Sequence, residues 1–400
     1  MRILIANDGF ADAGGVQTYL DAVGAGLASR GHEISMLYLD LAPLAGPPSA
    51  VEAAHWFSIT RDGTDRTIEA LRQWKPDACF SHNMSDLDVD RRLLSVAPVI
   101  KFMHGYFGTC VGGQKMFRVP TARPCNRTLG ASCIALYFPR RCGELSVATM
   151  IRHYRWANEQ RDLFNRYRAI VVGSEHMRSE YVRNGADERR VHVDPLFSHH
   201  EELASRAPDL RTQSVVFIGR MTTLKGGDLL VRAVAEASSR LPKPIELVMV
   251  GDGPQRVAWE RLASSLQIRS TFVGWRSGEE RWGWLRRASL LAVPSVWPEP
   301  FGLVGLEAGA LGVPAIAFDV GGIREWLTPG ENGYLVAADP PRASALADGL
   351  VRAFSHPDEL IAMRCRAAET AKRMSLERHL DRLEHILRAP ETQCENSAGR

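Results

Sequence analysis

The sequence lacks several features that would place it in a special class of protein. No apolar run reaches the roughly 20 residues of a membrane-spanning helix. The first 15 residues show neither the apolar core nor the cleavage site of a secretory leader, so we expect a cytoplasmic protein with mostly reduced cysteines. No repeat of solenoid or propeller length is apparent. Basic and acidic residues nearly cancel, at 49 against 46, so net charge alone indicates no partner.

What is present is the composition of an ordinary globular protein, with 45% hydrophobic and 24% charged residues in a chain of 400. Because domains usually contain about 100–200 residues, this length favours two domains. Short apolar runs alternate with helical patterns from residues 2–6 onward, and the alternation starts again at residues 214–218. This pattern predicts an α/β protein of two doubly wound, Rossmann-like domains that face each other across a cleft.

The boundaries follow from where the alternation stops. We expect residues 169–173 to form the last strand of the first half, and residues 194–213, with two prolines and no apolar period, to interrupt the pattern. The resulting division is a first domain at 1–195 with a Cys/Arg-rich insertion at about 105–150, a linker at 196–212, a second domain at 213–365, a helix at 366–388 that packs back on the first domain, and a loose tail at 389–400.

The most informative block is PSVWPEPFGLVGLE, at residues 294–307. Glu299 is followed by a loop, a helix is expected to begin at Leu303, and Glu307 lies one turn inside it. A helix start offers unpaired backbone N–H groups to phosphate, and a carboxylate accepts several hydrogen bonds from hydroxyl groups. The spacing alone fits two surface glutamates equally well, but it can also place one carboxylate at each end of a hydroxyl-rich ligand.

Glycine-rich turns follow several expected strands of the second half. Gly219-Arg220 leads to Lys225, Gly251 opens a second turn, and a Gly-Gly pair at 321–322 a third. Arginine grips phosphate with two hydrogen bonds, and lysine adds a point charge. Since the carboxyl ends of parallel strands share one edge of a sheet, these turns together indicate an anion site, although each charge alone could be a solvated surface group.

The order FIGRMTTLKGG, LVMVGDGP, FVGW and PSVWPEPFGLVGLEAGALGVPAIAFDVGGIREW resembles the C-terminal donor domain of the GT-B retaining glycosyltransferases of family four (glycosyl transferases group 1). The turn at 14–16 and the stretch SEHMRSEYVRNGA resemble the N-terminal domain of the same family. The resemblance spans about residues 1–388. It implies that the first domain binds an acceptor and that the second binds a nucleotide sugar.

The resemblance also implies roles for single residues. Glu307 would hold the ribose hydroxyls, Glu299 would face the donor sugar, and His104 would face that sugar from the first domain. Arg220 and Lys225 would neutralise the diphosphate leaving group. Further donor contacts are implied for Phe301, Gly302, Leu303, Gly219, Gly251 and Trp275, the last equally well explained as a packing aromatic, and Gly14 and Gly15 allow close backbone approach to the acceptor or a phosphate.

We expect neither a metal nor a cofactor, because the nucleotide sugar is a substrate and Arg220 and Lys225 supply positive charge. Asp86, Asp88 and Asp90 alternate in the first half and are interpreted as a solvated acidic loop. Within the insertion, the sequence leaves open whether the cysteines bind zinc, form disulfides or only pack, since no C-x2-C pair occurs. These are Cys110, Cys125, Cys133 and Cys142.

Residues 115–168 contain 11 basic and 3 acidic residues, a net charge of +8, with interleaved aromatics. Three interpretations stay open for this segment: a membrane-surface patch, a site for an anionic or lipid-phosphate acceptor, and a solvated face. No motif indicates nucleic-acid binding.

The function implied is transfer of a hexose-type sugar, with retained anomeric configuration, from a nucleotide diphosphate sugar to an acceptor hydroxyl in polysaccharide, glycolipid or glycoside biosynthesis. The favoured donor is a UDP-sugar, and a GDP-sugar is the next. The acceptor would be a carbohydrate, a lipid-linked or a small molecule. Two alternatives stay open, a sugar-nucleotide epimerase of related two-domain fold and a non-catalytic nucleotide-binding protein.

Overall fold

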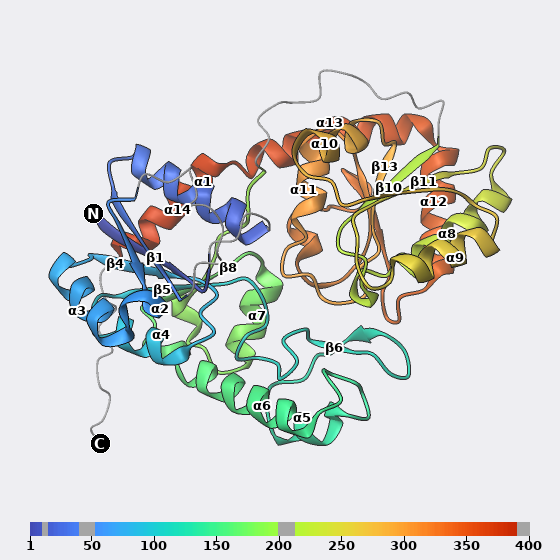
Figure 1. Ribbon diagram of the computed structural model, residues 1–400. Coiled ribbons are helices and arrows are strands. Elements are labelled where there is room, and N and C mark those ends of the chain that lie inside the picture. The colour runs from blue at the N-terminus through green and yellow to red at the C-terminus, as the bar shows by residue number, and fades with distance from the viewer. Residues whose placement is uncertain (10–14, 40–52, 199–212, 390–400) are drawn as a thin grey trace, which may run out of the picture.

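A computed structural model describes residues 1–9, 15–39, 53–198 and 213–389 of the chain. Two α/β domains lie side by side, each built on its own parallel sheet (Figure 1). The predicted fold class is therefore confirmed. Gly14, most of the predicted linker and the tail beyond residue 389 lie outside the described residues.

The first domain contains a sheet of seven strands, all parallel. Its central strands consist mostly of apolar residues, because helices cover both faces of the sheet. Across the sheet the strands are β3 (His55–Ser58), β2 (Glu33–Tyr38), β1 (Arg2–Asn7), β4 (Ala78–Ser81), β5 (Val99–Met103), β8 (Ala169–Val172) and β9 (Val191–Val193).

The sequence analysis did not predict two strands of this sheet. The strand at 169–173 was expected to be the last of the first half, but β9 follows it, and β3 was not expected at all. Both are edge strands of three or four residues, each containing a histidine. Such short, partly polar segments lack the apolar run that marks a buried strand.

The second domain has a six-stranded parallel sheet. The strand order reverses at β10: β11 and β12 extend the sheet on one side of it, and β13, β14 and β15 extend it on the other. Ligands bind at such a switch point, beyond the carboxyl ends of the strands. Across the sheet the strands are β12 (Arg269–Gly274), β11 (Glu246–Val250), β10 (Ser214–Ile218), β13 (Leu290–Val293), β14 (Ala315–Phe318) and β15 (Gly333–Val336).

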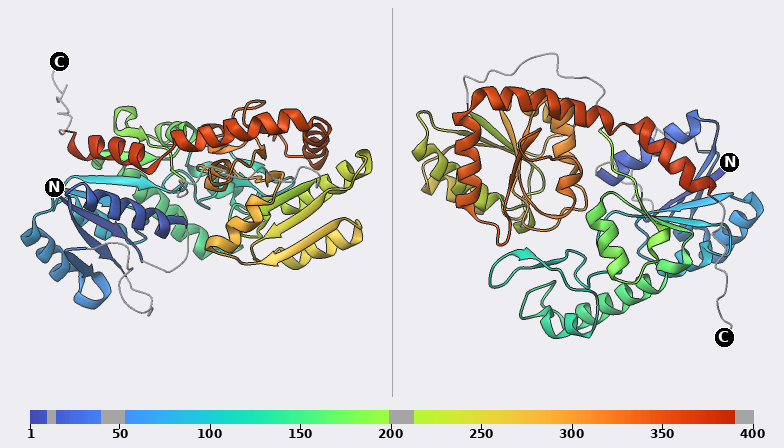
Figure 2. Two further views of the ribbon diagram at one scale, coloured as in Figure 1. Left: turned by 90° about the horizontal axis from the view of Figure 1, so that it is seen from above. Right: turned by 180° about the vertical axis from the view of Figure 1, so that it is seen from behind.

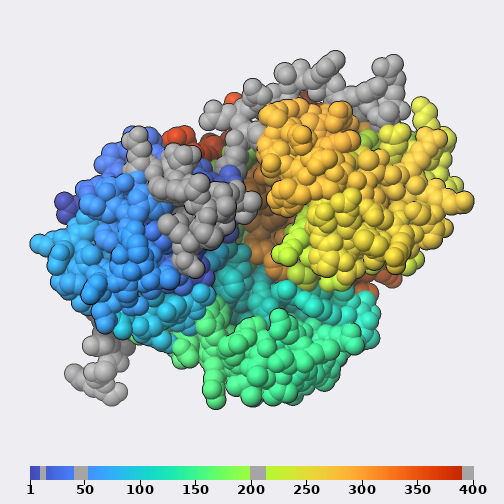
Figure 3. All heavy atoms as spheres, in the orientation of Figure 1, coloured from blue at the N-terminus to red at the C-terminus, as the bar shows by residue number. Residues whose placement is uncertain are grey.

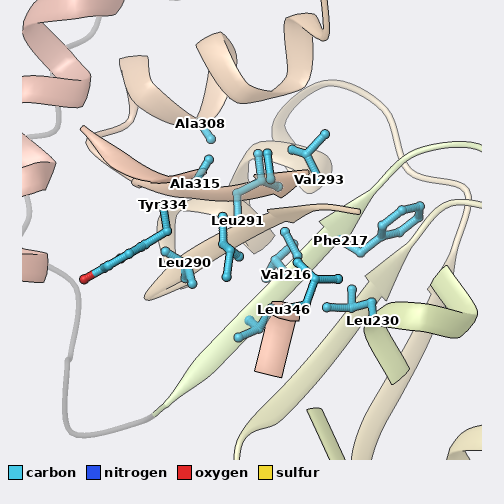
Figure 4. Close-up of a cluster of buried hydrophobic side chains, with 14 of the residues drawn as sticks. Val216, Phe217, Leu230, Leu290, Leu291, Val293, Ala308, Ala315, Tyr334 and Leu346 are labelled. Carbon is cyan, nitrogen blue, oxygen red and sulfur yellow. The ribbon is translucent and has the colours of Figure 1, made fainter. Parts of the chain in front are cut away.

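Helices cover these sheets and complete the two cores. In the second domain, Val216 and Leu291 of the sheet pack with Leu230 and Leu346 of two covering helices (Figure 4). The first domain has α1 (Gly15–Ser29), α2 (Ile59–Asp62), α3 (Thr64–Trp74), α4 (Leu87–Leu93), α5 (Ala131–Tyr137), α6 (Val147–Asp162) and α7 (Glu175–Arg183). The second has α8 (Gly227–Arg240), α9 (Arg256–Ser265), α10 (Gly278–Arg286), α11 (Leu303–Ala310), α12 (Ala343–Ser355) and α13 (Pro357–Arg373).

The chain returns to the first domain at its end (Figure 2). Helix α13 packs on α11 of the second domain, and α14 (Leu376–Arg388) packs on α1 of the first. The boundary that we placed between residues 365 and 366 falls inside α13, because the helix breaks only at 374–375. On α14, His379 Nε2 lies 2.8 Å from the Tyr19 hydroxyl and Arg382 Nε lies 2.7 Å from Asp194 Oδ1, which fixes the returning helix.

An insertion follows β5 and lies beneath both domains (Figure 3). It contains the hairpin β6 (Met116–Phe117) and β7 (Arg123–Pro124), then α5 and α6. A small apolar core of its own holds α5 against α6, formed by Val111, Leu129, Tyr137, Met150 and Ala157. Met116 instead lies buried in the core of the second domain, so the hairpin bridges the two domains.

The interpretation of the acidic triplet as a solvated loop was wrong for Asp90 and for the loop, since α4 begins at Leu87, whereas Asp86 and Asp88 are exposed. Asp86 caps α4 by accepting a hydrogen bond from the backbone N–H of Asp88, and Asp90 is fully buried. Asp90 Oδ2 lies 2.6 Å from Lys101 Nζ, so its charge is paired within the first domain.

Within the described parts of the chain, no three His, Cys, Asp or Glu side chains are arranged to hold a metal ion. The six cysteines that the structure describes are free thiols. None of the helices described is both long and apolar enough to cross a membrane.

Candidate functional site

Glu299 lies in the loop between β13 and α11, at the carboxyl edge of the second sheet. The side chain is buried, and its Oε1 accepts hydrogen bonds from Lys225 Nζ at 2.6 Å, Ser295 Oγ at 2.5 Å and Trp297 Nε1 at 3.0 Å. Lys225 ends the 3-10 turn η3 (Thr223–Lys225) that follows β10. Two residues 74 positions apart in the sequence therefore meet, and both were predicted to belong to the site.

This arrangement leaves part of each group available to a ligand. All three hydrogen bonds reach Oε1, and Oε2 of Glu299 accepts none from any residue that the structure describes. The Lys225 side chain is 29% exposed, so its ammonium group can still approach an anion. Ser295 and Trp297 were not predicted, although both lie in the same sequence block as Glu299.

The turns after β10 and β11 touch each other at the same edge. Gly251 has a φ of +133°, and a Cβ there would lie 2.1 Å from the carbonyl oxygen of Gly219. Only glycine allows this conformation and this approach. Arg220 follows directly and is exposed. The structure thus brings Gly219, Arg220 and Gly251 together beside the turn that carries Lys225.

Helix α11 begins at Leu303, as predicted, after Gly302 in the left-handed conformation. Its first backbone N–H groups have no acceptor inside the helix and carry the positive end of the helix dipole. Phe301 is buried, and its carbonyl accepts a hydrogen bond of 2.8 Å from Trp326 Nε1. The N–H of Gly322 donates to the carbonyl of Glu299 at 2.7 Å, so the loop is fixed on both sides.

Glu307 lies on the second turn of α11 and is buried. Arg281 of α10 faces it with both terminal nitrogens, Nη2 on Oε2 and Nη1 at 3.5 Å from Oε1. Burial raises the pKa of Glu307, and the Arg281 charge opposes that shift. Arg281 also stacks on Trp282, with 4.5 Å between its guanidinium carbon and the ring centre. Sequence reasoning missed Arg281 because it is one of several charged residues in a polar helix.

The first domain contacts the Glu299 loop at two points. The Tyr106 hydroxyl donates to the carbonyl of Pro298 at 2.9 Å, and the Ser174 hydroxyl donates to that of Pro300 at 2.6 Å. Ser174 also caps α7 by accepting from the N–H of Met177. Neither residue was assigned a role from the sequence, although Tyr106 lies only two positions after His104.

His104 lies half-buried at the end of β5, and its Nε2 is 2.9 Å from Nδ1 of His82. Burial, together with the nearby Lys101 charge, lowers the pKa of His104 to about 3. Burial lowers the pKa of His82 well below its usual value, helped by His104 and Lys101. Both rings are therefore neutral near pH 7, and one donates a hydrogen bond to the other. His82 was not predicted.

Two predicted site residues, Trp275 and Gly15, make none of the contacts described above. Trp275 follows β12 with a side chain that is 59% exposed, and Gly15 is the exposed first residue of α1.

A separate cavity of about 770 Å³ lies between the insertion hairpin and helices α8 and α9. Arg118 and Arg141 line it from the first domain, and Arg232 from the second.

Comparison with known families covers most of the chain. Residues 13–196 match the family described as Glycosyltransferase Family 4, and residues 212–356 match Glycosyl transferases group 1.

Among curated proteins, the D-inositol 3-phosphate glycosyltransferase of Rhodococcus jostii (strain RHA1) is 36% identical over 53% of this chain and 47% of its own length. The protein of the same name from Nocardia farcinica (strain IFM 10152) is 29% identical over 92% of this chain and 83% of its own. The chain thus spans about half the length of several curated relatives that it matches.

Among solved structures, Anabaena HepE in complex with UDP and glucose superposes with a TM-score of 0.69 and 17% identity, over 97% of this chain and 99% of that one. This likeness establishes the fold as GT-B, as the sequence motifs predicted.

Proposed function

This chain belongs to the family 4 (group 1) glycosyltransferases, and on that premise we propose that it moves a sugar from a nucleotide diphosphate sugar to an acceptor hydroxyl with retention of configuration. The observation that carries the proposal is the contact between Lys225 and Glu299 at the carboxyl edge of the second sheet. It places a cation and a partly unoccupied carboxylate next to the start of α11, where a phosphate and a sugar can bind together.

In the proposed reaction, the bond between the anomeric carbon and the phosphate oxygen breaks, and the acceptor oxygen bonds to that carbon on the same face. The acceptor proton passes to the departing phosphate oxygen. Lys225, Arg220 and the N–H groups at the start of α11 stabilise the charge that develops on the diphosphate, so the step needs neither a metal ion nor a carboxylate nucleophile. Glu299 Oε2 accepts hydrogen bonds from the sugar, and Glu307 accepts them from the ribose.

UDP-sugar is the favoured donor and GDP-sugar the next. Anabaena HepE binds UDP and glucose, and the Rhodococcus and Nocardia relatives are named for glycosyl transfer to an inositol phosphate. These likenesses support a nucleotide sugar donor and a hydroxyl-rich acceptor, which could be a free carbohydrate, a small glycoside precursor or a lipid-linked sugar. The neutral His82–His104 pair would present an uncharged ring to the transferred sugar.

The experiment is a two-step assay on the purified chain. First, a thermal-shift screen of UDP- and GDP-sugars identifies the donor, since a ligand that binds the native state raises the unfolding midpoint. Second, the donor is incubated with candidate acceptors, and the product is analysed by NMR for anomeric configuration. A product with retained configuration supports the proposal. An inverted product, conversion of the donor to its epimer, or binding without turnover for every acceptor contradicts it.

A further inference from the structure

The outer end of the insertion exposes an unusual number of large apolar side chains. The described residues leave eight such side chains exposed, and four of them lie within residues 134–151. Single exposed apolar residues are normal on protein surfaces, but a local group of them marks an interaction site. We call this group the apolar tip; it consists of Ile134 (41% exposed), Leu145 (70%), Val147 (59%) and Ile151 (42%).

The apolar tip is built on a firm support. Met150 and Ala157 on the inner face of α6 pack into the small core of the insertion, which also fixes α5. Val147 and Ile151, one helical turn apart, therefore point outward because the other face of the helix is already buried. Figure 1 places α5 and α6 along the outer edge of the first domain, away from both sheets.

Positive charge continues the same face of α6. Arg152 and Arg155 are exposed and form no ion pair with any described acid, whereas Glu159, one turn further, is paired with Arg91 of α4 at 2.6 Å. Ile151, Arg152 and Arg155 line one shallow groove of about 500 Å³. The face thus changes from apolar to basic along the helix. Two acids lie beside it: Glu144, which is exposed, and Glu159, which also lines the groove but is paired with Arg91.

The tertiary structure also separates this face from the rest of the basic segment. The hairpin at 116–124 is held against the second domain by Met116, which lies in that domain's core, although its Arg118 and Arg123 are exposed. Within segment 115–168, the large apolar side chains that are exposed all lie on α5, on α6 or in the loop between them. The surface of mixed apolar and basic character in this segment is therefore the outer face of α5 and α6.

We propose that the apolar tip, with Arg152 and Arg155, is a docking surface for an anionic lipid bilayer. Arginines at the headgroup level are attracted to anionic lipids, and the apolar side chains beside them enter the boundary between headgroups and acyl chains. Arg152 and Arg155, which form no ion pair with any described acid, favour an anionic bilayer over a neutral one. This surface assignment is independent of the transfer reaction, which does not require it.

The test uses the full-length chain and vesicle flotation. Vesicles of phosphatidylcholine alone are compared with vesicles of phosphatidylcholine and phosphatidylglycerol, at low and high salt. We expect about tenfold more bound protein on the anionic vesicles at low salt, and a loss of most of that difference at high salt because salt screens exposed charges.

Two variants locate the surface. The triple variant Leu145→Ser, Val147→Ser, Ile151→Ser and the double variant Arg152→Glu, Arg155→Glu should each lower binding to anionic vesicles about tenfold. The matched control is Val257→Ser, Ile361→Ser, which removes two side chains of similar exposure from the second domain and should bind like wild type. Unfolding midpoints and turnover of a water-soluble acceptor verify that each variant folds.

Three results would overturn the proposal. They are wild-type protein that stays unbound with anionic vesicles, equal binding to neutral and anionic vesicles, and a triple variant that binds like wild type. Light scattering tests whether the partner is a second copy of the chain. Concentration-dependent dimers that the triple variant abolishes, without vesicle binding, would make this face an interface between copies of the chain. Since binding and turnover are measured separately, failure of the glycosyl transfer would leave the vesicle result interpretable.

Discussion

Lys225 Nζ lies 2.6 Å from Glu299 Oε1, and this contact joins the loops that follow β10 and β13. These two strands are neighbours at the centre of the second sheet, so their carboxyl ends open at the same point. The pair links the group proposed to face the diphosphate with the group proposed to face the sugar. A change at either residue should therefore affect catalysis more than folding.

We expect Lys225→Ala to lower kcat by about 10²–10³-fold, because charge stabilisation of the leaving group is lost. The free energy of unfolding should fall by only about 1–2 kcal/mol, since Ser295 and Trp297 still donate to Glu299. Arg220→Ala should also lower kcat, without a change in unfolding midpoint. The control is Lys243→Ala, at an exposed position between α8 and β11. Wild-type turnover in both Lys225→Ala and Arg220→Ala would refute the assignment.

Arg281→Leu should raise the KM for the nucleotide sugar about tenfold, which corresponds to ~1.4 kcal/mol of binding. Without the Arg281 charge, burial raises the pKa of Glu307 unopposed. The carboxylate then becomes protonated at a higher pH as the pH falls, so KM in the variant should begin to rise at a higher pH than in wild type. Initial rates across a pH series measure this shift.

Two comparisons make the Arg281 prediction specific. Arg281→Lys retains the charge and should keep the wild-type pH dependence while it loses the two-nitrogen contact. Arg286→Leu, on the same helix but paired with Glu279 at the surface, should change neither KM nor its pH dependence. If the KM of Arg281→Leu follows the wild-type pH profile, Arg281 does not act through Glu307.

Gly251→Ala should destabilise the second domain, because the new Cβ would lie 2.1 Å from the Gly219 carbonyl at a φ that alanine rarely adopts. We expect a loss of about 2–3 kcal/mol and weaker donor binding. Gly283→Ala is the matched control, since it lies inside α10 with nothing within 4 Å of its Cβ, and it should be neutral or stabilising by up to ~1 kcal/mol. Thermal unfolding with and without donor measures both effects, and equal midpoints would contradict this account.

The His82–His104 pair should make the free energy of unfolding depend on pH. The folded-state pKa of His104 is about 3, below the unfolded value of about 6.5, so its contribution is fully present above pH 6.5 and is lost as the pH falls toward 3. Over that range each such histidine lowers the free energy of unfolding by at most ~1.4 kcal/mol per pH unit. Urea titrations of wild type and of the double variant His82→Asn, His104→Gln measure the slope.

As the pH falls, the free energy of unfolding of the double variant should decrease less steeply than that of wild type. The difference in slope should correspond to at most two bound protons. His356→Gln, at an exposed site on the second domain, serves as the control. Identical slopes for wild type and the double variant would mean that the pair is not held neutral in the folded protein.

The sequence was sufficient to predict the two-domain α/β architecture of the protein. The strand Ser214–Ile218 was predicted to the residue, because a strand buried on both faces is a continuous apolar run bounded by turn residues. The start of α11 was also predictable, since a loop with two prolines and Gly302 permits no earlier helix. Edge strands β3 and β9 were missed because they contain too few apolar residues to form such a run.

Local rules failed where a charge found its partner far along the chain. Asp90 has the sequence context of a surface acid, yet it is buried against Lys101 of β5. Likewise, nothing near Arg281 indicates that it faces Glu307, because that contact depends on how α10 is rotated over α11. The basic segment shows the same limit, since only the tertiary structure decides that Met116 packs into the second domain while Val147 and Ile151 stay exposed.

The sequence by itself thus determined the two-domain α/β architecture, the family and the strand ends that carry glycine, arginine, lysine and glutamate. Only the tertiary structure decided that Lys225 meets Glu299, that Arg281 holds Glu307 and that His82 shares a hydrogen bond with His104. The physical reason is that strand and helix positions follow from local apolar periodicity, whereas side-chain pairs at a sheet edge depend on which distant loops the parallel strands bring together.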